Sequence, residues 1–133
     1  MASIFTRIIR GEIPCIKLVE NDYCIAFMDI FPLRKGHVLV VPKAEVNEFY
    51  DLNDRDLSEL ILFSKKISLA MKKVFEMRIG LSIIGLEVPH THIHLIPIES
   101  ANDINFNQEK PSFSQEELQV IANQIKEQLT NII

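Results

Sequence analysis

The chain has 133 residues, of which 47% are apolar and 24% are charged, and these proportions predict one globular domain over residues 1–133. A formal net charge of −4 excludes a general electrostatic attraction to nucleic acid. Cys15 and Cys24 do not form a CxxC pair, and we expect small apolar side chains in a reducing compartment. We also expect a cytoplasmic protein without a membrane anchor, because the N-terminus lacks a signal-peptide core and no apolar run approaches the roughly 20 residues that a bilayer requires.

The first part of the chain predicts a short helix followed by three strands. Ser3 can cap the helix and Gly11 can end it. Asn21 and Asp22 favour a turn between the first two strands. A continuous apolar run predicts that the third strand is central and covered on both faces. The expected helix covers residues 3–10, and the expected strands cover residues 17–20, 24–30 and 37–42.

A long helix is predicted to begin near Asn53, whose side chain can cap it. Seven apolar residues follow helical spacing and should face the core: Leu57, Leu60, Ile61, Ile67, Met71, Val74 and Phe75. Three others, Leu62, Phe63 and Leu69, form a second apolar face. That face indicates either a subunit interface or a helix that is buried on most sides, and the sequence leaves both readings open.

The last part of the chain predicts two more strands, at residues 80–84 and 91–98, and a polar surface loop at residues 101–111. Ser114 and Glu117 form a capping box at the start of a C-terminal amphipathic helix. The fold class that results is α+β, with a mostly antiparallel sheet of about five strands, a long helix and a C-terminal helix.

All four histidines fall into two short segments, with His37 in one and His90, His92 and His94 in the other. Alternate residues of a strand share a face, so the last three should line one side of a strand. Two kinds of chemistry fit such a row. One is a metal site, and the other is nucleophilic catalysis at phosphorus by the middle imidazole. The alternative is that the histidines are exposed to solvent and have no functional role.

The segment at residues 89–96 resembles the signature of the histidine triad family, histidine–x–histidine–apolar–histidine–apolar–apolar. Residues 4–14, 26–30 and 36–43 resemble further segments of that family in the same order. Within the superfamily the chain is similar to the small nucleotide-hydrolase and phosphoramidase branch, and not to the larger uridylyltransferase branch. The resemblance implies the family's fold and a homodimer, with the long helix and a strand at the interface.

The resemblance also implies the roles of the histidines. His92 would attack the α-phosphorus of a purine nucleotide derivative, and water would then release the nucleoside monophosphate from the covalent nucleotidyl-imidazole. His94 and His90 would bind phosphate oxygens or hold the tautomer of His92, and His37 would support the triad. The implied function is that of a nucleotide hydrolase or nucleotidyl transferase, whose leaving group is an amine or a further phosphate.

A purine nucleotide similar to AMP is the implied ligand, and the implied contacts come from two strands and the first helix. Asp29 would accept hydrogen bonds from the ribose hydroxyls. A carboxylate among apolar neighbours is costly to bury without such partners. The apolar residues implied to sandwich the base are Phe5, Ile8, Phe27 and Ile30, although core packing alone would also explain them.

Two segments depart from the family pattern. The glycine-rich stretch before the triad is shortened to residues 84–89, and Glu87 stands where the family has a hydroxyl residue. Glu87 would either favour a cationic leaving group, such as an amine on AMP, or point to solvent. Some relatives bind structural zinc, but here Ser3, Thr6 and Glu45 replace three of the four ligands. We therefore expect no structural zinc and no cofactor.

Two other classes of function remain to be compared with hydrolysis. A nucleotide-binding regulatory or partner module with little catalysis is suggested by the altered stretch before the triad. A metalloenzyme that uses His90, His92 and His94 would need metal for activity and would lose activity to chelators. Turnover that depends on His92 separates the first of these classes from the hydrolase.

Overall fold

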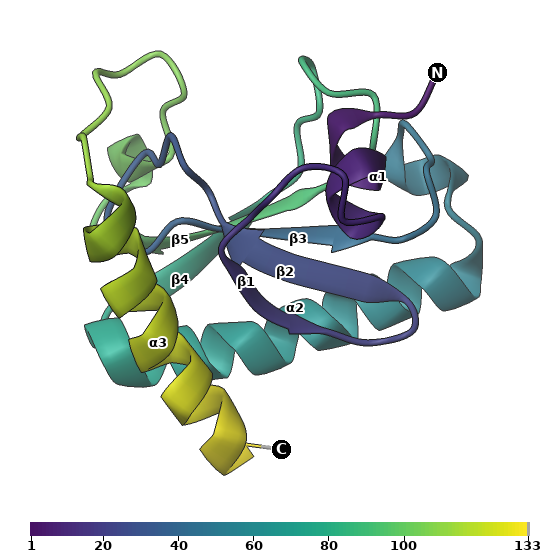
Figure 1. The fold of residues 1–133 in the computed structure, drawn as a ribbon. Coiled ribbons are helices and arrows are strands. Elements are labelled where there is room, and N and C mark those ends of the chain that lie inside the picture. The colour runs from purple at the N-terminus through teal and green to yellow at the C-terminus, as the bar shows by residue number, and fades with distance from the viewer. Residues whose placement is uncertain (133) are drawn as a thin grey trace.

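The computed structural model describes residues 1–132, and Figure 1 shows the course of the chain. The helices are α1 (Ile4–Ile9), α2 (Asp54–Phe75) and α3 (Gln115–Ile132), with short 3-10 helices η1 (Phe49–Asp51) and η2 (Ala101–Asp103). The strands are β1 (Lys17–Glu20), β2 (Cys24–Met28), β3 (Val38–Pro42), β4 (Arg78–Ser82) and β5 (Ile93–Ile98). The α+β class predicted from the sequence is therefore confirmed.

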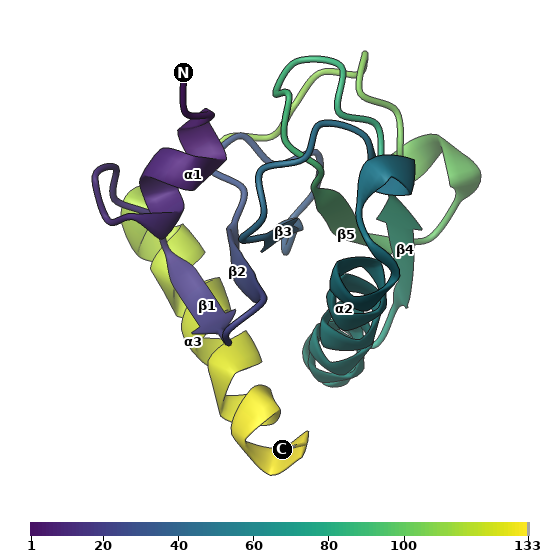
Figure 2. The same ribbon diagram turned by 90° about the vertical axis from the view of Figure 1, so that its right-hand side faces the viewer.

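The five strands form one antiparallel sheet in the order β1-β2-β3-β5-β4. The apolar run of β3 lies in the middle, and all five of its residues are buried, as its composition predicts. Helices α2 and α3 pack against one face of the sheet and bury the larger core there. The opposite face carries α1, whose Phe5 packs with Phe27 and Leu39 in a smaller cluster. Figure 2 shows α1 above β1, while α3 runs down behind β1 and α2 lies below β5.

Four of the five strands have boundaries that differ from those predicted. β2 ends at Met28 rather than at residue 30, β3 begins at Val38 rather than at residue 37, and β4 covers residues 78–82 rather than 80–84. β5 begins at Ile93, so His90 and His92 precede the strand. The backbone N–H of Thr91 bonds the carbonyl of Val46, 2.7 Å away, instead of a neighbouring strand. Local periodicity does not reveal that long-range contact.

Helix α2 begins after Asn53, whose side chain caps the backbone N–H of Asp56 as expected. Ile61 was predicted to face the core, but 42% of its surface is exposed. Phe63 is buried, whereas Leu62 and Leu69 are 54% and 49% exposed, so the helix is not covered on most sides within one chain.

No helix within residues 1–132 combines the length and the apolar character that crossing a membrane requires.

Candidate active site

The register of the sheet brings distant residues to the face that carries α1. Phe27 on β2 pairs with Leu39 on β3, and Leu39 pairs with His94 on β5. Laterally paired residues of a sheet share a face. His94 therefore lies in the same row as Phe27, on the side where α1 packs.

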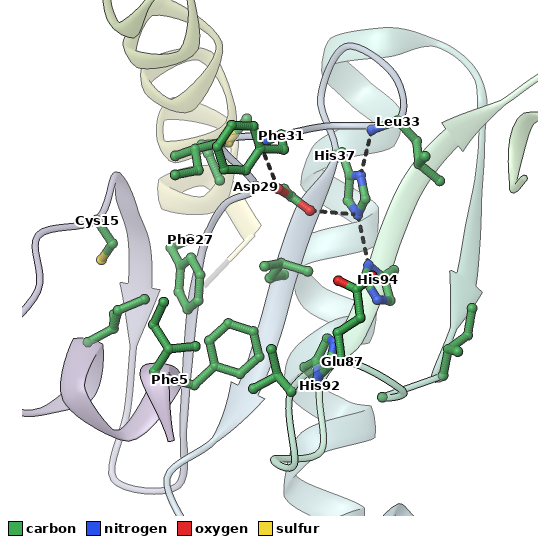
Figure 3. Close-up of a pocket in the computed structure, with 18 of the residues that line it drawn as sticks. Phe5, Cys15, Phe27, Asp29, Phe31, Leu33, His37, Glu87, His92 and His94 are labelled. Carbon is green, nitrogen blue, oxygen red and sulfur yellow. Dashed lines mark hydrogen bonds and ion pairs between the residues drawn. The ribbon is translucent and has the colours of Figure 1, made fainter. Parts of the chain in front are cut away.

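A pocket of about 500 Å³ opens on this face (Figure 3). That volume suits a small ligand. The pocket is lined by nine of the ten residues that the sequence singles out: Phe5, Ile8, Phe27, Asp29, Ile30, His37, Glu87, His92 and His94. The tenth, His90, does not line it. The structure thus brings together segments from four separate parts of the chain, while the roles of the residues remain to be argued.

A chain of hydrogen bonds fixes the protons on His37 and His94. The backbone N–H of Leu33 donates to Nδ1 of His37 at 3.0 Å, so the proton of this neutral ring lies on Nε2. His37 Nε2–H then donates to Nδ1 of His94, 2.9 Å away. Nδ1 of His94 is consequently an acceptor, and the proton of His94 lies on Nε2. The chain of bonds therefore makes His94 a hydrogen-bond donor at its free nitrogen.

In His92 the proton lies on Nδ1 rather than on Nε2. Its Nδ1 lies 2.7 Å from the carbonyl oxygen of His90, which can only accept, so Nδ1 carries the proton. Nε2 then holds an unshared electron pair. No side-chain nitrogen or oxygen within residues 1–132 is both fully buried and without a hydrogen-bond partner. The free Nε2 atoms of His92 and His94 are thus accessible, and both rings line the pocket. An accessible imidazole lone pair is a nucleophile.

His90 corrects the expectation that three imidazoles line one side of a strand. Its Nε2 donates to the carbonyl of Pro42 at 2.7 Å, and its Nδ1 accepts from the hydroxyl of Ser3 at 2.7 Å. Both ring nitrogens are occupied within the protein, and the ring is fully buried. His90 can therefore reach neither a phosphate nor a metal through its ring, and it meets the triad through the carbonyl that orients His92.

The partners of His90 belong to a polar cluster, Ser3, Thr6, Glu45 and His90, which ties α1 to the segment after β3. One carboxylate oxygen of Glu45 accepts from the backbone N–H of Ser3 at 2.7 Å and from the hydroxyl of Thr6 at 2.6 Å. These bonds, the one from Ser3 first, lower the pKa of Glu45 to about 2. Ser3 also caps α1 by accepting from the N–H of Thr6.

The family resemblance implies that this cluster stands where some relatives bind structural zinc, but its residues do not fit that ion. Zinc in such sites is held by thiolates and imidazoles, whereas three members here offer oxygen. The fourth, His90, has no free ring nitrogen. The absence of structural zinc stays a prediction, which metal analysis of the purified protein tests.

A second group, Asp29, His37 and His94, brings three donor atoms within 4.8 Å of one another. The proton positions argue against a metal there. Since Leu33 donates to Nδ1 of His37, the facing Nε2 carries a proton and cannot be a ligand. One carboxylate oxygen of Asp29 already accepts from the N–H of Phe31 at 2.8 Å. The group fits a hydrogen-bonded triad better than a metal centre.

Burial keeps the histidines neutral. It lowers the pKa of His37 to about 3, with the nearby charge of Lys110 acting in the same direction. It also lowers the pKa of His94 to about 3, followed by the influence of His37. The pKa values of His90 and His92 are lowered as well, again mainly by burial. At neutral pH the ring of His92 therefore has its electron pair available for attack.

The end of the pocket beside α1 is apolar and aromatic. The ring centroids of Phe5 and Phe27 lie 5.8 Å apart, and the ring centroid of Phe5 lies 4.9 Å from that of His92. Asp29 follows β2 at the edge of this compartment, where its second carboxylate oxygen lies 3.5 Å from Nε2 of His37. A flat apolar group could enter here with polar atoms directed toward Asp29 and the histidines.

The opposite end contains residues that sequence reasoning missed. Phe106, Asn107 and Lys110 line the pocket, although residues 101–111 were predicted to form only a surface loop. The ring of Phe106 meets that of His94 edge-on, with centroids 4.8 Å apart. A lone aromatic residue in an otherwise polar segment was the available signal. Glu87 lines the pocket too, which contradicts the alternative that it points only to solvent (Figure 3).

The fold and the pocket define a class: an antiparallel α+β protein in which a neutral imidazole with a free ring nitrogen faces an aromatic compartment. The family model described as "HIT domain" matches residues 10–101. The chain belongs to the histidine triad (HIT) family.

Three relatives illustrate this membership. The adenosine 5′-monophosphoramidase hnt1 of Schizosaccharomyces pombe is 35% identical over 99 residues, covering 73% of this chain and 74% of the relative. The adenosine 5′-monophosphoramidase HNT1 of Saccharomyces cerevisiae is 39% identical over 98 residues, covering 72% of this chain and 62% of the relative. The crystal structure of a Hit-like protein from Bartonella henselae, described as involved in cell-cycle regulation, has a TM-score of 0.83 at 32% identity and 95% coverage of both chains.

Proposed function

We propose that this protein hydrolyses the P–N bond of adenosine 5′-phosphoramidates through a covalent nucleotidyl-His92 intermediate. The observation that carries the proposal is the Nε2 atom of His92, which is unprotonated, accessible and oriented by the carbonyl of His90. Two relatives at 35% and 39% identity are adenosine 5′-monophosphoramidases by name, which supports the substrate class.

In the first step, Nε2 of His92 attacks the α-phosphorus and a new P–N bond forms to the imidazole. The bond from phosphorus to the substrate nitrogen breaks, and the amine leaves after taking up one proton. His94 is suited to donate a hydrogen bond to a phosphate oxygen, because its free Nε2 carries hydrogen. Since the ring is neutral it keeps that proton, and the proton that the amine takes up comes from solvent. In the second step, water attacks phosphorus and releases a proton to solvent, the bond to His92 breaks, and AMP is released.

The rest of the nucleotide would occupy the aromatic end of the pocket. A purine packed against the aromatic cluster of Phe5 and Phe27 gains burial, each base–aromatic contact contributing about 1–3 kcal/mol. The carboxylate of Asp29 is suited to accept from the ribose hydroxyls. These assignments extend to dinucleoside polyphosphates, which carry the same AMP moiety and differ in the leaving group.

Hydrolysis of adenosine 5′-phosphoramidate by the wild type and by His92→Asn tests the proposal, with diadenosine tetraphosphate as a second substrate. We expect turnover by the wild type and a loss of at least about a thousandfold in the variant. Equal turnover by both proteins would refute a His92 nucleophile. No turnover of either substrate, with AMP still bound, would favour the nucleotide-binding module.

We also propose that the chain forms a homodimer through α2 and the neighbouring edge strand β4. Ile61, Leu62 and Leu69 on α2 and Leu81 on β4 are all exposed, and β4 has a free edge. Exposed apolar groups beside a strand edge favour association. A solution mass of two chains by light scattering would support the dimer, and a mass of one chain would contradict it.

A further inference from the structure

Beyond the histidines, the pocket is also lined by the segment that joins η2 to α3, residues 104–114. Phe106, Asn107 and Lys110 of this segment line the pocket together with His92 and His94. The segment therefore lies where a leaving group would emerge if the nucleotide occupied the aromatic end. Figure 1 shows it rising at the same end of the molecule as the loop before β5.

The base of this segment is held by specific contacts. Asp103 accepts from the backbone N–H of Glu99 at 2.7 Å and also bonds Arg34, which precedes β3. Ile104 lies over Gly80 of β4 so closely that a Cβ at Gly80 would come within 2.7 Å of its Cδ1. With the edge-on contact of Phe106 to His94, these anchors place the segment at the triad rather than free in solvent.

Two residues of opposite charge line the pocket, one from each of its two loops. Glu87 comes from the loop before β5, and Lys110 comes from the segment after η2. Within residues 1–132, neither one has a charged partner within ion-pair distance. The positive charge of Lys110 also contributes to the lowered pKa values of His37 and His94, so it acts on the catalytic end of the pocket. Both charges are available to a ligand.

We propose that Lys110 is a specificity-determining residue that contacts the leaving group and that it opposes Glu87 in setting which leaving-group charge the enzyme accepts. The inference rests on the proposed function. A polyphosphate leaving group is attracted by Lys110 and repelled by Glu87, and a cationic amine experiences the reverse. Lys110 thereby makes the anionic leaving group of a dinucleoside polyphosphate acceptable, although Glu87 replaces the family's hydroxyl residue.

The test is the ratio of kcat/KM for diadenosine tetraphosphate to kcat/KM for adenosine 5′-phosphoramidate. We expect Lys110→Gln to lower this ratio about tenfold and Glu87→Gln to raise it by a similar factor, since each change removes one unit charge beside the leaving group. Lys110→Arg keeps the charge and should keep the ratio. Lys126→Gln, a change of an exposed lysine on α3, is the matched control and should leave the ratio unchanged. A ratio within twofold of the wild type in Lys110→Gln would overturn the proposal.

Equilibrium binding separates this inference from the proposed function. If the wild type hydrolyses neither substrate, the proposed function fails, and the affinities for ADP and AMP still test Lys110. We expect Lys110→Gln to weaken ADP binding about tenfold more than AMP binding, because the additional phosphate lies toward Lys110. Equal effects on the two nucleotides would overturn the role of Lys110 whether or not the protein is a hydrolase.

Discussion

The two ends of the pocket are built in different ways. The aromatic end is formed by regular elements, with Phe5 on α1 and Phe27 on β2, both buried against the sheet. The rest of the pocket is bordered by two loops, which carry Glu87 and Lys110 on exposed side chains. A rigid compartment suits the part of a substrate that stays constant, and loops tolerate change where the leaving group varies. The histidines lie between the two ends.

Among the substitutions that test how the two ends of the pocket and the histidines between them work, we expect the largest loss of activity at His37. In His37→Asn, the amide oxygen can still accept from the N–H of Leu33, but the bond to His94 is lost. We expect kcat to fall about a hundredfold, because His94 loses the partner that fixes its proton. In His37→Gln, the longer amide can donate to His94 and should retain more activity. Steady-state kinetics of the two variants measures this, and equal losses would count against the proton arrangement.

Stability should depend on pH because the histidine cluster is neutral. His37 and His94 have folded pKa values of about 3, below the usual 6.5, so the unfolded chain binds more protons between these values. Stability is therefore complete above pH 6.5 and is lost as the pH falls toward 3. The expected slope is about 1.4 kcal/mol per pH unit for each histidine. Urea unfolding between about pH 7 and pH 5 measures it, and a constant free energy of unfolding would contradict neutral burial.

At the rigid end, Asp29→Asn should remove the ribose contact without disturbing the turn, because the amide oxygen can still accept from the N–H of Phe31. We expect AMP to bind about tenfold more weakly, which corresponds to the loss of a hydrogen bond to a charged group. The control is 2′,3′-dideoxy-AMP, whose affinity should hardly change. Calorimetric titration of the wild type and of Asp29→Asn with both ligands measures these affinities. If the substitution weakened the binding of both ligands equally, Asp29 would not contact the ribose hydroxyls.

The smallest effect is expected in the polar cluster Ser3, Thr6, Glu45 and His90. Ser3→Ala removes both the cap of α1 and the donor to Nδ1 of His90, so we expect a loss of about 1–3 kcal/mol in the free energy of unfolding. KM should rise more than kcat falls, because α1 carries Phe5 into the pocket. Gln124→Ala on the exposed side of α3 is the control and should change stability by less than about 0.5 kcal/mol. A Ser3 variant as stable as this control would show that the cluster does not anchor α1.

The same division between rigid elements and loops explains what the sequence could predict. Caps and periodic apolar runs depend on neighbours along the chain, so Ser3, Asn53 and the buried strand β3 were predicted correctly. The start of β5 and the inward position of His90 depend on distant partners such as Val46 and Pro42, and local periodicity carries no information about them.

The limit of prediction from the sequence is clearest for the pocket residues that lie on loops. Phe106 and Lys110 belong to an aperiodic polar segment, and only its anchors at Arg34 and Gly80 bring them to the triad. The placement of Glu87 in the pocket likewise follows from the path of a short loop rather than from a repeating pattern. Residues of this kind are found by structure, although their charges can be noted in the sequence.

The central claim, a nucleotidyl-His92 intermediate, is tested most directly by rapid acid-free quenching of the wild type with adenosine 5′-phosphoramidate, followed by peptide mass spectrometry. The account predicts that one adenylyl group is attached to the peptide that carries His92 and that the adduct is absent from His92→Asn. Turnover without an adduct in the wild type, together with undiminished turnover in the variant, would contradict it.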